Sequence, residues 1–222
     1  MDEIVIYEKK RRRHPTQAQY HAVFQTLSNW FFREHITLWF WGHDGNKIRD
    51  GRTERLLNRF RKNNDLQAFW WGYRWIYCIK RVNSTRGDRT PDYVNHGVGC
   101  SEALVRFHIS DRNSEILPNF RLPNIRPDGA LKLSTGTTLL FEFCSYGNTL
   151  HRLKEKIKAY KESGGDYLVV FILDVDPKDV KKRAEGPFYF TDYDTFKNVN
   201  YGQQIDAKIY TYGIDGITYS LR

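Results

Sequence analysis

Two carboxylates near the middle of the chain, Asp128 and Glu142, have the type and spacing of a metal site. Asp128 follows a proline, which keeps the residue before it extended, and Glu142 closes a mostly apolar run at residues 138–141. A carboxylate at the end of an apolar strand is costly to bury unless a cation pairs with it. On neighbouring strands of a hairpin the two would face one site, and oxygen ligands with open positions suit Mg²⁺ or Mn²⁺ better than zinc.

The segments around these carboxylates predict a hairpin, a helix and a further strand. Residues 134–137 form a turn between two extended segments, and residues 138–141 are typical of a strand buried on both faces. Residues 149–162 have apolar side chains at helical spacing and basic side chains on the other faces. A lysine of this helix would reach the two carboxylates and hold a water or a phosphate there. The apolar run at residues 167–173 predicts a central strand, joined by a right-handed crossover in a mixed sheet.

This order of motifs resembles the core of the PD-(D/E)XK nuclease superfamily: proline-aspartate, a hairpin, a strand ending in glutamate, then a helix. More narrowly, RPDG at residues 126–129, FEFCSYGNT at residues 141–149, and Lys156 four residues before Tyr160 resemble the plasmid replication-relaxation family. Proteins of that family carry an N-terminal winged helix followed by a nuclease-like domain. Cys144 departs from the pattern, because the superfamily prefers lysine at this position and the family often has aspartate.

The resemblance implies functions for four residues. Asp128 and Glu142 would be metal ligands and catalytic residues, and Lys156 would replace the motif lysine from its place on the helix. Many nucleases of this superfamily take an acid from their first core helix, which residues 99–107 predict here with Glu102 as the candidate. The alternative for Glu102 is a surface glutamate that the helix dipole favours.

The N-terminal half predicts three helices and a hairpin. A capping-box pattern at residues 16–19 begins a helix that is expected to run to about Glu34. A shorter helical or extended piece follows at residues 37–41, then a basic helix at residues 47–62 and an aromatic hairpin at residues 66–80. This is the order of a winged helix, in which the basic third helix enters the major groove and the hairpin lies beside the backbone.

The predicted DNA contacts lie on the basic helix, on the hairpin and in a basic N-terminal arm. Phosphate contacts by arginine and lysine carry no sequence information, so no DNA target is predicted. The candidates are Lys47, Arg49, Arg52, Arg55, Arg59 and Lys62 on the helix, Trp71 and Arg74 on the hairpin, and Arg11, Arg12 and Arg13 in the arm.

These patterns predict an α+β or α/β fold with two domains. Residues 1–82 would form a winged-helix DNA-binding domain with its basic arm, and residues 83–92, which are polar with glycine and proline, would be the linker. Residues 93–222 would form the PD-(D/E)XK nuclease-like domain, a mixed sheet flanked by helices. All six tryptophans lie between residues 30 and 75, where most are expected in the core.

Composition and charge indicate a soluble protein with a polyanionic partner. Of 222 residues 40% are hydrophobic, which excludes general disorder, and the longest apolar runs are too short to span a bilayer. The net charge of +9 arises entirely in residues 1–90, which points to double-stranded DNA as the partner of that half. Without a signal-peptide pattern or paired cysteines, the expected location is the cytoplasm. The oligomeric state is not predicted, with a homodimer as one option.

Two hypotheses from different classes follow. The first is a Mg²⁺- or Mn²⁺-dependent DNA endonuclease that nicks or cleaves plasmid or mobile-element DNA, in replication or DNA processing. The second is a non-catalytic DNA-binding protein, a replication initiator or transcriptional regulator, that keeps the nuclease-like domain for structure. Cys144 at the motif's third position favours the second, and a lysine supplied by the helix favours the first.

Overall fold

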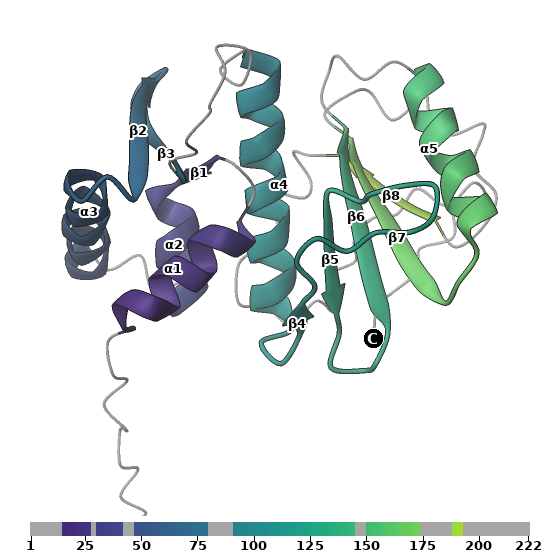
Figure 1. Ribbon diagram of the computed structural model, residues 1–222, viewed down its shortest axis with the longest axis horizontal. Coiled ribbons are helices and arrows are strands. Elements are labelled where there is room, and N and C mark those ends of the chain that lie inside the picture. Colours follow the sequence, from purple (N-terminus) through teal and green to yellow (C-terminus); the bar gives the residue numbers. More distant parts are fainter. Residues whose placement is uncertain are drawn as a thin grey trace, which may run out of the picture.

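The computed structural model describes residues 15–27, 30–41, 47–79, 91–144, 150–173 and 188–192. Within them, one long helix, α4 (Pro91–Ser110), lies between an N-terminal part and a five-stranded sheet (Figure 1). The predicted mixed α+β class is confirmed. The elements before α4 are α1 (Gln17–Thr26), β1 (Phe31–Phe32), α2 (Arg33–Trp41), α3 (Lys47–Lys62), β2 (Leu66–Trp71) and β3 (Arg74–Ile79). Those after it are β4 (Glu115–Ile116), β5 (Gly129–Lys132), β6 (Thr138–Cys144), α5 (Leu150–Ser163), β7 (Tyr167–Leu173) and β8 (Phe188–Asp192).

Helix α1 begins at the predicted capping box and ends earlier than predicted. The Gln19 backbone N–H donates to the Thr16 hydroxyl over 3.3 Å, and the Gln19 side chain accepts from the Thr16 N–H over 2.8 Å. The prediction that this helix runs to about Glu34 is wrong, because Leu27 already has extended backbone angles. The two phenylalanines of β1 instead pair antiparallel with β3 and are buried, so tertiary packing overrides the helical spacing.

The basic helix and the aromatic hairpin form where the sequence predicts them. α3 buries Leu57 and Phe60, and α2 shows that the short preceding piece is helical. β2 and β3 pair antiparallel around a two-residue turn, in which Gly72 has a φ of 61°. A positive φ at the first turn position is what a type II′ hairpin turn requires, and glycine adopts it without steric cost.

The second sheet is mixed and is covered on both faces by helices. Its order is β4-β5-β6-β7-β8, with β4, β5 and β6 antiparallel and β6, β7 and β8 parallel. The predicted interior strand at residues 167–173 is therefore confirmed as β7. Alternate residues of β6 point to opposite helices: Phe141 joins the core cluster that contains α4 residues, and Leu140 joins the cluster that contains α5 residues. Figure 1 shows α4 and α5 on the two sides of the sheet.

Helix α4 packs against both halves of the molecule and begins within the range predicted as the linker. It begins at Pro91, inside the range 83–92, and proline is favoured in the first turn of a helix because no intrahelical donor is needed there. One buried cluster joins Phe24 of α1, Ala103 of α4 and Phe141 of β6. The core is therefore continuous from the N-terminal part through α4 into the sheet.

Glycines let α4 approach β6 closely. A Cβ atom at Gly99 would lie 2.3 Å from the Phe143 ring, whose side chain is fully buried. We expect Gly99→Ala to lower the free energy of unfolding by about 1–3 kcal/mol, the usual cost of overpacking a core. Gly51→Ala on exposed space in α3 is the matched control and should be neutral or slightly stabilising. Chemical denaturation measures both, and an unchanged stability of Gly99→Ala would contradict the close packing.

Several predictions fall on residues outside the described ranges. They are the basic arm with Arg11, Arg12 and Arg13 and the remainder of the linker. The sequence also predicts short strands at residues 4–7 and 207–212 and a short polar helix at residues 176–184, which lie outside these ranges too. None of the described helices combines the length and apolar character needed to cross a bilayer.

Candidate functional site

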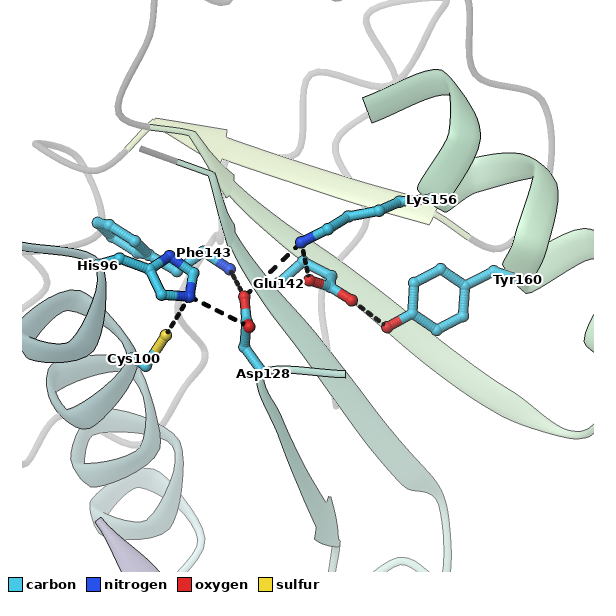
Figure 2. Close-up of polar contacts among 7 residues, drawn as sticks. All are labelled: His96, Cys100, Asp128, Glu142, Phe143, Lys156 and Tyr160. Atoms are coloured by element: carbon cyan, nitrogen blue, oxygen red, sulfur yellow. Dashed lines mark hydrogen bonds and ion pairs between the residues drawn. The ribbon is translucent and has the colours of Figure 1, made fainter. Parts of the chain in front are cut away.

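The β5–β6 hairpin and α5 bring Asp128, Glu142 and Lys156 together, as predicted (Figure 2). Asp128 lies one residue before the Gly129–Phe141 pair of the hairpin, so it faces Glu142 across the two strands. The Lys156 ammonium bonds to Glu142 Oε2 and lies 3.9 Å from Asp128 Oδ2. Two carboxylates and one ammonium from three separate elements thus share one polar cluster.

Glu142 is the most deeply buried member of this cluster. Its exposed fraction is 0%, and it lies within β6 rather than at the end, because the strand continues to Cys144. Besides Lys156, the Tyr160 hydroxyl donates to Glu142 Oε1 over 2.6 Å. Lys156 and Tyr160 are four residues apart on α5, so one helical face supplies both partners of the carboxylate.

Asp128 is held by groups from two sides. The Phe143 backbone N–H donates to its Oδ2 over 2.9 Å, and His96 Nε2 on α4 lies 3.2 Å from its Oδ1. Figure 2 shows Asp128 between the α4 side chains and the Glu142–Lys156 pair. The Asp128 carboxylate therefore links the helix on one face of the sheet to the helix on the other.

The surroundings shift the pKa values of the two carboxyl groups in opposite directions. Burial and the Asp128 charge raise the pKa of Glu142 to about 8, although Lys156 and Tyr160 favour its ionised form. Burial also opposes ionisation of Asp128, but the His96 hydrogen bond, Lys156 and the Phe143 N–H outweigh it and lower its pKa. At neutral pH the pair thus holds one carboxylate firmly ionised and a proton shared with the other.

Lys156 supplies the cation that Cys144 cannot. Burial opposes the charge on Lys156, but Asp128 and Glu142 raise its pKa, so the ammonium stays protonated. The Cys144 thiol packs under α5 with Leu153 and Ile157, and burial raises its pKa to about 12. A neutral thiol therefore stands at the motif's usual lysine position, while the helix lysine enters the carboxylate cluster.

The resemblance implies a catalytic role for Glu102, but its partners Arg106 and His35 lie outside the cluster of Asp128, Glu142 and Lys156. It accepts from Arg106 over 2.6 Å and lies 3.5 Å from His35 of α2. Burial alone would raise its pKa, but these two partners lower it instead. Glu102 is two residues, about 200° of helical rotation, from Cys100, which lies beside His96 and Asp128. The contact with His35 thus places Glu102 toward the N-terminal part. The surface-residue alternative is wrong, because Glu102 is mostly buried.

Two residues beside Asp128 were not singled out from the sequence. His96 and Cys100 lie one turn apart on α4, and Cys100 Sγ is 3.5 Å from His96 Nε2. The donor atoms of His96, Cys100 and Asp128 all lie within 4.8 Å of one another. The only signal in the sequence was the four-residue spacing of histidine and cysteine, which places both on one helical face.

A cavity of about 500 Å³ opens beside these three residues. It lies between α1, α4 and the loop that leads into β5, and neither Glu142 nor Lys156 lines it. Arg126 lies on its wall and donates to Asn119 over 3.1 Å. The cavity therefore gives access to Asp128 from the His96 side.

The predicted DNA-contacting residues of α3 are exposed where side chains are described. Arg52, Arg55, Arg59 and Lys62 lie outside the core stripe, whereas the side chains of Lys47 and Arg49 fall outside the described set. A row of basic side chains on the exposed face of one helix is suited to phosphate contacts.

At the hairpin, the most exposed aromatic residues differ from the predicted Trp71. Trp71 is half-buried against the cluster that contains Trp30, whereas Trp70 is 59% and Tyr73 82% exposed. Arg74 is exposed, with its guanidinium carbon 3.5 Å from the Phe32 ring centroid. Of the two predicted hairpin residues, Arg74 is thus the more exposed.

Comparison of the chain with models of known protein families, with curated proteins and with solved structures finds no match.

Proposed function

We propose that the protein is a metal-dependent DNA endonuclease of the PD-(D/E)XK type. The observation that carries the proposal is the buried cluster of Asp128, Glu142 and Lys156, which converges from the β5–β6 hairpin and α5. Burying two carboxylates and an ammonium is costly, and apolar side chains of similar volume would often stabilise the fold as well or better. Perturbed ionisable groups gathered in this way are typical of catalytic sites.

The residues present fit Mg²⁺ or Mn²⁺ in charge and donor type. Asp128 and Glu142 offer carboxylate oxygens, the ligands that both ions prefer. The Lys156 ammonium neutralises only one of the two carboxylates, and burial together with the Asp128 charge raises the pKa of Glu142, which favours a proton on it. A divalent cation would replace that proton.

In this mechanism Asp128 and Glu142 would hold the metal ion, which when bound lowers the pKa of a water and stabilises charge on the scissile phosphate. Lys156 would neutralise charge that develops on the phosphate oxygens, or orient the attacking water. Tyr160 would fix the Glu142 carboxylate, because its hydroxyl donates to one of the two oxygens. Asp128 would be oriented by the Phe143 N–H.

The N-terminal part would deliver the site to plasmid or mobile-element DNA. Its order of helices and hairpin is that of a winged helix, with the exposed arginines of α3 available for the major groove and the phosphates beside it. The continuous core through α4 would hold this DNA-binding surface in a fixed relation to the carboxylate cluster.

We expect Arg55→Ala and Arg59→Ala each to weaken DNA binding and to reduce the slope of log K against log salt by about one. Each exposed arginine that contacts a phosphate releases counterions, and its removal abolishes that release. Lys132→Ala, an exposed substitution on β5, is the control and should leave the slope unchanged. Fluorescence anisotropy over a salt series measures the slope, and equal slopes for all proteins would exclude α3 as the DNA-contacting helix.

The test of the proposed activity is incubation of supercoiled plasmid with the purified protein in Mg²⁺, in Mn²⁺ and in a chelator. We expect nicked or linear DNA only with metal, and none from Asp128→Asn. Cleavage in the chelator would contradict the metal requirement, and wild-type activity of Asp128→Asn would contradict the site.

A second function is favoured by the bonding of Glu142. Both of its oxygens are already engaged, by Lys156 and by Tyr160, and the side chain is fully buried. A cluster closed in this way would suit a non-catalytic DNA-binding initiator or regulator. A mobility shift on the same plasmid without cleavage in any metal would support that function.

A further inference from the structure

We propose that His96, Cys100 and Asp128 form a binding site for one zinc-class transition-metal ion, with its fourth coordination position open to the adjacent cavity. This site differs in ligand chemistry from the Asp128–Glu142 pair, and its occupancy does not depend on nuclease activity. Asp128 would contribute Oδ1 to it, whereas Oδ2 faces the Phe143 N–H and Lys156.

The distances between donor atoms match tetrahedral coordination. With zinc bonds of about 2.3 Å to sulfur and about 2.0–2.2 Å to nitrogen or oxygen, tetrahedral ligands lie about 3.6 Å apart for a nitrogen–sulfur pair and about 3.4 Å for a nitrogen–oxygen pair. The observed separations are 3.5 Å from His96 Nε2 to Cys100 Sγ and 3.2 Å to Asp128 Oδ1. The two distances from Nε2 are thus close to those of a tetrahedral site, and all three donor atoms lie within 4.8 Å of one another.

The same geometry disfavours a catalytic cysteine–histidine–aspartate relay. In such a relay one ring nitrogen faces the nucleophile and the other faces the carboxylate. Here Cys100 Sγ and Asp128 Oδ1 both lie beside Nε2 of His96, so sulfur, nitrogen and oxygen converge on one point. Convergence of three donors is what a metal ion requires.

Charge and ligand type select the ion. A thiolate and a carboxylate carry two negative charges, which balance the charge of a dication in a partly buried position. The mixture of sulfur, nitrogen and oxygen ligands favours zinc or cobalt over magnesium. The thiolate is the form that binds a metal ion, so binding would release the Cys100 thiol proton.

The cavity accounts for the open position. His96, Cys100 and Asp128 all line the cavity of about 500 Å³, so a bound ion would face it with a water or ligand as its fourth partner. Three protein ligands and one exchangeable position are the arrangement of catalytic zinc sites, whereas structural sites are closed by four protein ligands.

Cobalt titration of the chelator-stripped, reduced full-length protein tests the site. We expect saturation at one equivalent, a near-ultraviolet thiolate-to-cobalt charge-transfer band, visible bands of tetrahedral cobalt, and displacement by Zn²⁺. Cys100→Ser should lose the charge-transfer band, and His96→Gln should bind cobalt at least about tenfold more weakly, since even outer partners of ligands are worth that much. His96 is partly exposed, so His96→Gln keeps the test valid if Cys100→Ser does not fold.

Cys144→Ser is the matched control, because Cys144 is also a buried thiol near Lys156 and Asp128 but is not among the three converging donors. It should retain the charge-transfer band. Absence of the band in the wild-type protein, or its persistence in Cys100→Ser, would overturn the site. Glu142→Gln separates the two proposals: it should keep the cobalt spectrum and lose DNA cleavage.

Discussion

Lys156→Met is expected to lower the free energy of unfolding by about 3 kcal/mol at pH 9, where Glu142 is ionised in the wild type. The substitution leaves the buried Glu142 and the ionised Asp128 without their shared cation. At neutral and acidic pH Glu142 already carries a proton, because its pKa is raised to about 8, so the loss is smaller there than at pH 9. Urea denaturation at two pH values measures both the size and the pH dependence.

Two further variants isolate the buried charge as the cause. Lys158→Met lies two residues along the same helix, where the side chain is 75% exposed and pairs with Glu162 on the helix surface, so it should change stability by less than about 0.5 kcal/mol. At pH 9, adding Glu142→Gln to Lys156→Met removes the uncompensated carboxylate and should recover part of the loss. A double variant as unstable as the sum of its single substitutions would contradict this explanation.

The second large effect is a fall in metal-free stability as the pH rises. The pKa of Glu142 is raised in the folded protein to about 8 from 4.5, so between these values the folded state binds a proton that the unfolded state has lost. Stability from this group is therefore fully present below about pH 4.5 and is lost as the pH rises through about 8. The loss is on the order of 3–5 kcal/mol, because each unit of pKa corresponds to about 1.4 kcal/mol.

The difference between wild type and Glu142→Gln isolates this titration. Other groups also have shifted pKa values and contribute to the pH dependence of stability. Burial, for example, lowers the pKa of His108 to about 4. The contribution of such a distant group is the same in both proteins and cancels in the difference. Thermal or urea denaturation in a chelator, from pH 5 to pH 9, should show wild type losing stability relative to Glu142→Gln. Mn²⁺ should increase the free energy of unfolding of the wild type most at high pH. Parallel curves would show that Glu142 is not buried with a raised pKa.

The predicted chemistry at Asp128, Glu142 and Lys156 came from local signals that the fold preserved. A proline before an acid, a turn between two extended runs and a helix with one basic face each depend on neighbouring residues only. The structure therefore brought all three side chains to one cluster. The deep burial of Glu142 was less visible, because β6 runs past it to Cys144 and the charge is compensated by residues on α5.

What the sequence could not predict depends on contacts between distant segments. The first helix ends at Thr26 because the phenylalanines of β1 pair with a hairpin more than forty residues later. His96 and Cys100 lie beside Asp128 because Gly99 lets α4 approach β6 closely, and this proximity cannot be read from the sequence. Glu102 lies on the expected helix and is the expected residue type, but it pairs with Arg106 on the same helix and with His35 of the N-terminal part.

The most direct test of the nuclease account is cleavage and binding measured together on one supercoiled plasmid, with wild type and Glu142→Gln, in Mn²⁺ and in a chelator. The account predicts that wild type nicks or linearises the DNA only with metal, and that Glu142→Gln cuts at least about 10³-fold more slowly, since the metal is worth several kcal/mol to the transition state. Both proteins should shift the DNA with equal affinity. Binding without cleavage in any metal, or undiminished cleavage by Glu142→Gln, would contradict it.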